Sequence, residues 1–207
     1  MVTVVLICWK RFEHFNEIID AWLSEPEVNE VLIWDNSGSF KCDKEGVVII
    51  NSQKNINGAV KYNIAVMAEN DLIINADDDI MPKPGIVKQL LAHYDDDAFI
   101  GVAGSRIIDG WTQREGFKNV KEPVEVDIVV GYLSLTNKKN LLGFDFSKFL
   151  WYNCELEMAG RTQDKLKQLV VPADAFEILP EAFDENALCG QREDLKDKEA
   201  RKWFPRK

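Results

Sequence analysis

Three consecutive carboxylates, Asp77, Asp78 and Asp79, follow the short apolar run from Leu72 to Asn75. Adjacent carboxylates repel one another, and a divalent cation or full solvation relieves that repulsion most readily. A solvated acidic turn is one interpretation of this stretch. Its position favours a ligand site, because the apolar run is predicted to be a buried strand and ligands collect at the carboxyl ends of strands in an open α/β sheet. We therefore predict that this acidic triplet binds a cation or a ligand.

Four polar turns are expected to share that edge, because each follows a predicted strand and parallel strands end at the same edge of a sheet. Lys10, Arg11 and Lys61 would bring positive charge to it. Taken singly, these residues are explained as surface charges or turn formers. Together they suit a nucleoside diphosphate with Mn²⁺ or Mg²⁺, because such ions prefer carboxylate and phosphate oxygens. The four turns span residues 8–11, 35–38, 55–58 and 77–79.

Several familiar motifs for metal or phosphate binding are absent from the sequence. A calcium-binding EF-hand that began at Asp77 would need Gly at its sixth position and Glu at its twelfth, where the chain has Pro82 and Lys88. The sequence has no GxxxxGK[ST] phosphate loop, and residues 8–12 lack the glycines of a dinucleotide-binding turn. Phosphate charge must therefore be met by a metal ion and by basic side chains.

Strands and helices alternate through the first part of the chain, which predicts successive βαβ units. The strands are indicated by runs of Val and Ile without polar alternation, as expected when both faces are buried. The chain is thus predicted to be a single α/β domain, with a mixed, mainly parallel central sheet flanked by helices. The predicted strands are residues 2–8, 31–34, 47–50 and 72–75, and the predicted helices are residues 13–23 and 60–68.

The pattern is less regular after residue 82. From residue 144 to residue 187 the aromatic and acidic residues follow no clear period, so no element is predicted there. Elsewhere we predict helices at residues 84–94, 137–142 and 194–203, strands at residues 99–103 and 124–132, and a hairpin or loop at residues 104–119.

Composition limits the classes of protein to consider. With 207 residues, 46% of them hydrophobic, the chain can bury a sizeable core. Its net charge of -10 argues against a nucleic-acid or anionic-membrane binder. No apolar run is long enough for a transmembrane segment, and the four separated cysteines suggest reduced thiols, so we expect a cytoplasmic protein. The basic segment 201–207 is interpreted as a frayed tail or the start of a further segment.

The order of these features resembles a known family. A Val/Ile strand comes first, then a strand that ends in Asp35-Asn36-Ser37, then the Asn- and Gly-containing segment from Asn55 to Asn63, and then an apolar strand that ends in three aspartates. This order resembles the nucleotide-sugar-dependent glycosyltransferases of the glycosyltransferase-A fold, particularly the family two group, which carry a DxD motif at that place. The resemblance covers residues 2–82 well and later residues in patches.

The resemblance implies roles for particular residues. Asp79 would be the main ligand of Mn²⁺ or Mg²⁺ at the diphosphate of a UDP-sugar, Asp77 would contact the metal or the ribose, and Asp78 would face the sugar. Asp35 would bind the uracil edge. Residues 1–82 would form the donor half and residues 83–207 the acceptor half. The stretch from Val126 to Gly131 resembles the family's stretch between the donor and acceptor sites, where Gly131 would let the backbone approach the sugars. The nucleotide and its phosphates would be lined by Lys10, Arg11, Asn57 and Lys61.

The resemblance also implies inverting transfer of a hexosyl or deoxyhexosyl group to a hydroxyl of a glycan or other acceptor, which needs a general base. Asp194, paired with Glu193, resembles the family's base, although the two acids would equally suit the start of a charged helix. Glu155 or Glu157 could hold the role instead. Two other functions stay open: a nucleotidyltransferase that makes nucleotide-sugars, and a non-catalytic module that binds a nucleotide or sugar.

Overall fold

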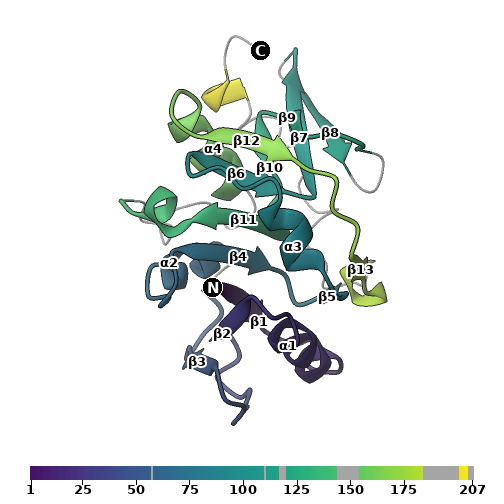
Figure 1. The fold of residues 1–207 in the computed structure, drawn as a ribbon. Helices are drawn as coiled ribbons and strands as arrows, with labels where there is room; N and C mark the ends of the chain where they lie inside the picture. The colour runs from purple at the N-terminus through teal and green to yellow at the C-terminus, as the bar shows by residue number, and fades with distance from the viewer. Residues whose placement is uncertain (57, 110, 117–119, 144–153, 184–200, 205–207) are drawn as a thin grey trace.

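The computed structural model describes residues 1–56, 58–109, 111–116, 120–143, 154–183 and 201–204. Its centre is an eight-stranded sheet with the strand order β3-β2-β1-β4-β11-β6-β12-β9 (Figure 1). The first four strands of the chain are mutually parallel and agree with the predicted ones. They are β1 (Val2–Cys8), β2 (Val28–Asp35), β3 (Val47–Asn51) and β4 (Leu72–Ala76).

Helices cover both faces of this sheet. Side chains of β1 alternate between the faces, so Val4 and Leu6 join one hydrophobic cluster while Val5 joins another. The first cluster includes residues of α1 (Phe15–Leu23) and α3 (Ile86–Leu91), and the second includes residues of α2 (Val60–Ala65) and α4 (Cys154–Thr162). The mixed, mainly parallel sheet with flanking helices confirms the predicted fold class.

The second half of the sheet departs from the predicted elements. The central strand β11 (Leu133–Asn137) is antiparallel to both β4 and β6 (Ala98–Gly101), and the sequence did not predict it. Its buried Ser134 and Thr136 hide it from a search for apolar runs. The strand predicted at residues 124–132 is wrong, because that stretch changes sheets. It forms β9 (Val124–Glu125) beside β12 (Lys167–Val170) and β10 (Ile128–Val129) beside β7 (Ala103–Ile108).

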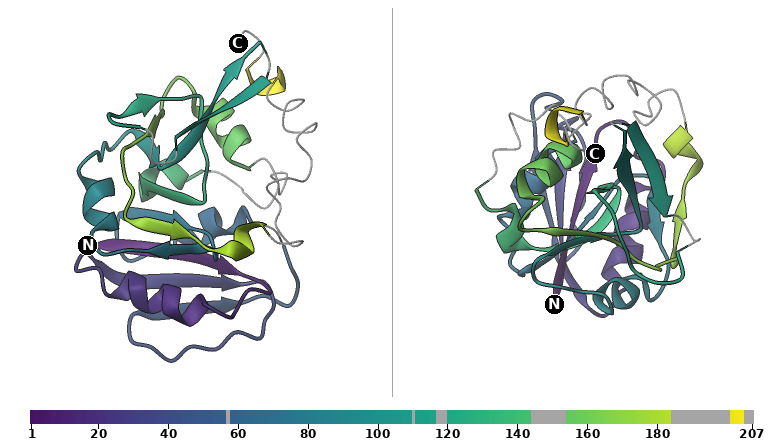
Figure 2. Two further views of the ribbon diagram at one scale, coloured as in Figure 1. Left: turned by 90° about the vertical axis from the view of Figure 1, so that its right-hand side faces the viewer. Right: turned by 90° about the horizontal axis from the view of Figure 1, so that it is seen from above.

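The remaining described strands form two smaller sheets. β7 (Ala103–Ile108) and β8 (Trp111–Gly116) form a hairpin, one of the two alternatives predicted for this region, and Figure 2 shows it rising away from the large sheet. β5 (Ile80–Pro82) begins directly after the acidic triplet and pairs with β13 (Phe176–Ile178). The triplet therefore connects β4 of the large sheet to β5 of this two-stranded sheet. Short 3-10 helices span Lys138–Leu141 and Pro180–Phe183.

The described end of the chain packs against α4. Phe204 is only 3% exposed and shares a hydrophobic cluster with Leu156 and Ala159, while Trp203 lies against Gly160. The interpretation of this segment as a frayed tail is therefore wrong for residues 201–204. Most of the helix predicted at residues 194–203 lies outside the described residues. Within the described part of the chain, no helix has the length and apolar character to cross a membrane.

Candidate functional site

The carboxyl ends of β1, β2, β3 and β4 meet at one edge of the sheet, as the sequence predicts. The strand register aligns Cys8 at the end of β1 with Asp35 at the end of β2, and aligns Asp35 with Asn51 at the end of β3. The Cys8 thiol donates a hydrogen bond of 3.7 Å to Asp35 Oδ1. The turns that follow these strands are thus neighbours in space, and the acidic triplet follows the fourth strand at the same edge.

The backbone of the acidic triplet is fixed on both sides. The Asp77 amide donates to the Tyr132 carbonyl at 2.9 Å, and the Ile80 amide donates to the Asp77 carbonyl at 3.3 Å. The Asp79 carbonyl accepts from the Leu179 amide at 2.8 Å. The triplet is therefore a defined turn between β4 and β5, whose main chain is held by hydrogen bonds.

The chain supplies cations to all three carboxylates of the triplet. Lys61 Nζ lies 2.6 Å from Asp77 Oδ1. Arg11 Nη1 lies 3.2 Å from Asp78 Oδ1 and 2.7 Å from Asp79 Oδ2. From the sequence, Arg11 and Lys61 are expected to line the nucleotide, whereas in the structure they pair with the triplet itself. Each pair uses one oxygen of its carboxylate, which leaves the second oxygen outside the pair.

Burial and mutual repulsion still resist negative charge at this site. Burial raises the pKa of Asp78 to about 7, and the charges of Asp79 and Asp77 add to the effect of burial while Arg11 opposes it. Burial and the charge of Asp77 raise the pKa of Asp79 to about 6, again against the influence of Arg11. An additional cation would relieve this repulsion. The two basic side chains therefore only partly balance the triplet.

The donor set fits a divalent cation that is shared with a bound molecule. Carboxylate oxygens are the hard ligands that Mg²⁺ and Mn²⁺ prefer, and Asp77 and Asp79 offer them. Among the residues that the structure describes, however, no group of three or more His, Cys, Asp and Glu side chains is arranged to hold a metal ion. Magnesium is commonly held by one or two carboxylates together with substrate phosphates. The triplet suits that arrangement better than a metal cage made only of protein.

Asp35 organises its own loop. Its carboxylate accepts hydrogen bonds from the Ser37 amide at 2.7 Å, the Ser37 hydroxyl at 2.6 Å and the Phe40 amide at 2.7 Å. Burial alone would raise the pKa of Asp35, but these hydrogen bonds outweigh burial and hold the pKa below its usual value. The residue is fully buried. In this structure the carboxylate is therefore committed to the β2 loop, and its predicted contact with uracil stays a prediction.

Of the other residues predicted to line the nucleotide, Lys10 is described by the structure and Asn57 is not. Lys10 is exposed and its Nζ lies 4.2 Å from the centre of the Trp9 ring, which is itself 40% exposed. Asn57 lies outside the described residues. Asn36 belongs to the predicted turn 35–38 but was given no role of its own. It joins the β2 loop to the next turn, because its Oδ1 accepts from Trp34 Nε1 and from the Ile56 amide, each at 3.0 Å.

A second cluster of polar groups adjoins the triplet through Lys61, whose Nζ also donates to the Gly131 carbonyl at 2.6 Å. Glu155 lies against Gly131, and its Oε1 accepts from the Tyr62 hydroxyl at 2.9 Å. The Cys154 thiol donates to Glu155 Oε2 at 3.1 Å. Buried Lys61 thus contacts Asp77 and the Gly131 carbonyl, and Glu155 at the start of α4 lies beside that glycine.

The electrostatics of this cluster keep its donors protonated. Burial would lower the pKa of Lys61, but the charges of Asp77 and Glu155 raise it above its usual value. Burial and the charge of Glu155 raise the pKa of the Tyr62 hydroxyl well above normal. Both groups therefore hold their protons at neutral pH and donate to the carboxylates. Tyr62 was not predicted as a site residue. Its position next to Lys61 in the sequence was the one feature that could have suggested it.

The structure gives the candidate general bases different surroundings. Glu157 forms an ion pair along α4, with Arg161 Nη2 2.6 Å from its Oε1. Glu193 and Asp194 lie outside the described residues. Glu155 is the acid that lies beside Gly131, whose carbonyl shares Lys61 with Asp77. The i to i+4 pair of Glu157 and Arg161 was a sequence signal for α4, in the stretch where no element was predicted.

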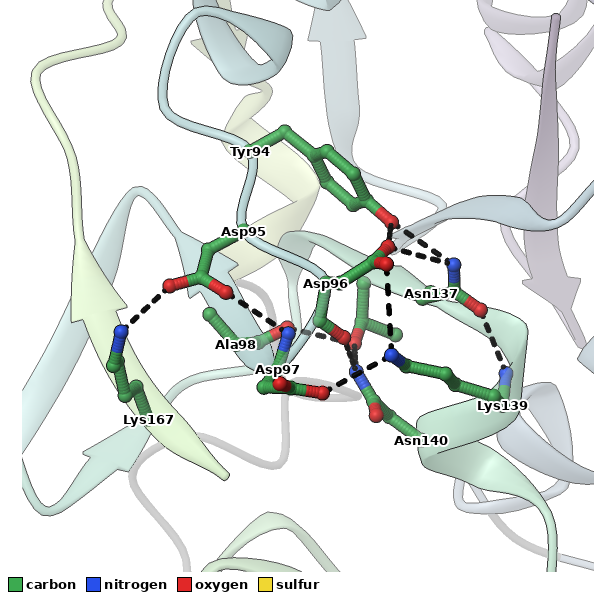
Figure 3. Close-up of polar contacts among 10 residues, drawn as sticks. Tyr94, Asp95, Asp96, Asp97, Ala98, Asn137, Lys139, Asn140 and Lys167 are labelled. Carbon is green, nitrogen blue, oxygen red and sulfur yellow. Dashed lines mark hydrogen bonds and ion pairs between the residues drawn. The ribbon is translucent and has the colours of Figure 1, made fainter. Parts of the chain in front are cut away.

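A second run of three aspartates, Asp95 to Asp97, lies at the opposite edge of the sheet. It precedes β6, which runs in the same direction as β4, so it lies at the amino end of its strand. Figure 3 shows these carboxylates paired with lysines, Asp95 with Lys167 at 2.7 Å and Asp97 with Lys139 at 3.0 Å. The same composition therefore has a structural use here, in fastening the loop before β6 to its neighbours.

Comparison with family models and with curated proteins gives no match. Solved structures do match. GalNAc-T7 with UDP, GalNAc and Mn²⁺ superposes with a TM-score of 0.67 at 12% identity, over 86% of this chain and 43% of that one. HddC from Yersinia pseudotuberculosis matches with a TM-score of 0.57 at 15% identity, over 88% of this chain and 96% of that one. The mannosyltransferase PcManGT from Pyrobaculum calidifontis, in complex with GDP-Man and Mn²⁺, gives 0.59 at 13% identity, over 84% and 55%.

The chain has the glycosyltransferase-A fold. The fold expected from the resemblance is thereby confirmed. The chain spans less than two thirds of the length of GalNAc-T7 and of PcManGT, and nearly all of HddC. At these identities the likeness concerns the fold, so activity must be argued from the residues at the carboxyl edge of the glycosyltransferase-A sheet.

Proposed function

We propose that this protein is a metal-dependent glycosyltransferase that moves a sugar from a UDP-sugar to a hydroxyl of a glycan or other acceptor. The observation that carries the proposal is the acidic triplet at the shared edge of four parallel strands, where Lys61 joins Asp77 to Gly131 and Glu155 lies beside Gly131. Further support comes from two structures of the same fold, one with UDP and Mn²⁺ and one with GDP-Man and Mn²⁺. The nucleotide is proposed to be UDP, as the sequence resemblance implies.

The donor would bind across the triplet. Asp79, together with Asp77, would hold Mn²⁺ or Mg²⁺ against the diphosphate, and Asp78 would face the sugar. Lys61 is already fixed beside Asp77 and would keep positive charge near the phosphates. A bound divalent ion stabilises the negative charge that develops on the departing diphosphate. The residues of the triplet thereby position the leaving group.

We place the general base at Glu155. In this step the carboxylate takes the proton of the acceptor hydroxyl, the acceptor oxygen bonds to the anomeric carbon, and the bond from that carbon to the diphosphate breaks. Hydrogen bonds from Tyr62 and Cys154 orient the carboxylate, which keeps further lone pairs for the acceptor. A single displacement of this kind inverts the anomeric centre. Asp194, with Glu193, stays the alternative base to be tested.

The test is nucleotide release from a panel of UDP-sugars and GDP-sugars with Mn²⁺, with and without candidate acceptors. We expect UDP release from at least one donor, faster with acceptor and lost in EDTA. Formation of pyrophosphate from a nucleoside triphosphate and a sugar 1-phosphate, without release from any nucleotide-sugar, would instead indicate a nucleotidyltransferase. Nucleotide-sugar binding with no turnover across the panel would indicate a non-catalytic binding module.

A further inference from the structure

We propose that Arg11 couples metal binding to nucleotide binding at the acidic triplet. Without a nucleotide, its guanidinium occupies the cation position beside Asp78 and Asp79 and opposes a divalent ion there. When the donor diphosphate binds, it takes over the guanidinium and leaves the carboxylates to the metal. This inference rests on the proposed function, because it concerns the same donor site.

The contacts of Arg11 support the first half of this exchange. A single nitrogen, Nη1, contacts one oxygen of Asp78 and one of Asp79, at 3.2 and 2.7 Å. The side chain of Arg11 is 15% exposed and those of the two aspartates are 16% and 14% exposed, so solvent screens the pair less than it would on the surface. A divalent ion on Asp79 would have to share that carboxylate with a guanidinium of the same sign of charge.

The position of Arg11 in the fold supports the second half. Arg11 lies between β1 and α1, so its backbone belongs to neither a helix nor a strand. Lys61, the other cation of the triplet, lies on α2 with a side chain 5% exposed, and the Gly131 carbonyl also holds it. A guanidinium matches the geometry of phosphate oxygens and pairs with them in bidentate fashion. Arg11 is therefore the cation that a diphosphate would recruit.

The consequence is a measurable coupling between the two ligands. If the nucleotide removes a competitor of the metal, then each ligand must strengthen the binding of the other by the same factor. Couplings of this kind commonly amount to about 5-fold to 150-fold in affinity. Metal binding to the free protein should therefore be weak, and metal binding to the UDP complex should be tighter by a factor in that range.

The experiment is a titration of the full chain with Mn²⁺, with and without saturating UDP, followed by the electron paramagnetic resonance signal of free Mn²⁺. Arg11→Gln should bind Mn²⁺ alone more tightly than the wild type does. The effect of UDP on Mn²⁺ affinity should be smaller than in the wild type, because only the phosphate oxygens that ligate the metal remain to couple the two ligands. Arg11→Met, which keeps the aliphatic stem, carries the same test if the Gln variant does not fold. Arg11→Lys restores the charge and should restore weak binding of Mn²⁺ alone.

Lys83→Gln is the matched control. Lys83 follows β5, four residues after Asp79, but its side chain is 51% exposed and pairs with Glu177 at 3.2 Å. Removing this charge should leave the Mn²⁺ affinity and its coupling to UDP as in the wild type. An equal gain in Mn²⁺ affinity in Lys83→Gln and Arg11→Gln would mean that net charge alone acts, and would overturn the inference.

Other outcomes separate the inference from the proposed function. Unchanged or weaker binding of Mn²⁺ alone in the neutral Arg11 variants overturns the coupling role. If the wild type in that case still binds UDP in a Mn²⁺-dependent way, the glycosyltransferase proposal stands. A wild-type protein that binds neither Mn²⁺ nor UDP, separately or together, overturns both.

Discussion

Replacing Gly131 by Ala should lower both stability and turnover, because the site has no room for a Cβ atom. That atom would lie 2.0 Å from the Tyr62 hydroxyl oxygen and 2.4 Å from Glu155 Oε1. Lys61 holds the Gly131 carbonyl at 2.6 Å, so the Tyr62 hydroxyl and the Glu155 carboxylate that accepts its hydrogen bond are the groups that must shift. Overpacking of this kind costs about 1–3 kcal/mol. A displacement of about 1 Å at a reacting group can lower turnover about 10²-fold.

The assays for Gly131→Ala are thermal unfolding, UDP binding with Mn²⁺, and UDP release with acceptor. The unfolding temperature should fall by about 2–4 °C for each kcal/mol lost, as expected for a chain of this size. Gly58→Ala is the control for stability, since nothing lies within 4 Å of a Cβ added there, and it should be neutral or slightly stabilising. Wild-type stability and turnover in Gly131→Ala would refute the close approach of Tyr62 and Glu155 to Gly131. Reduced stability with intact turnover would refute the role of Glu155.

Three further predictions concern single carboxylates. Glu155→Gln should leave UDP affinity unchanged and lower turnover by about 10²-fold or more, whereas Glu157→Gln should keep its rate; equal rates for the two would remove Glu155 from the mechanism. Asp79→Ala should abolish Mn²⁺-dependent UDP binding in calorimetry, while Asp96→Ala, in the other run of aspartates, should leave it intact. Because the pKa of Asp35 is lowered in the folded state, its contribution to stability is present above pH ~3.9 and is lost as the pH falls through the folded pKa. The urea midpoint of the wild type should therefore drop towards that of Asp35→Asn on acidification, and a constant difference between them would contradict this.

The donor half of the fold could be predicted from sequence because its signals are local. Strands buried on both faces appear as unbroken runs such as Val2–Cys8, and a polar turn follows each run. Parallel connections then force those turns to a common edge. The placement of the acidic triplet therefore needed no knowledge of contacts between distant residues.

The remaining features depend on such contacts. The strand Leu133–Asn137 contains polar residues that become buried only because β4 and β6 enclose them. The Thr136 hydroxyl donates a hydrogen bond to the Ala98 carbonyl, which offsets the cost of burying it. The pairing of Arg11 with Asp79 joins residues 68 positions apart. The sequence could indicate that the triplet needs positive charge. Only the folded structure shows that Arg11 and Lys61 supply part of that charge.

The acidic triplet is proposed to bind a nucleoside diphosphate through a divalent ion. The most direct measurement is a calorimetric titration of the wild-type protein with UDP, once in Mn²⁺ and once in EDTA. We predict saturable binding in Mn²⁺ that is lost, or at least about 5-fold weaker, in EDTA. Equal affinity in the two buffers, or no binding in either, would contradict the claim.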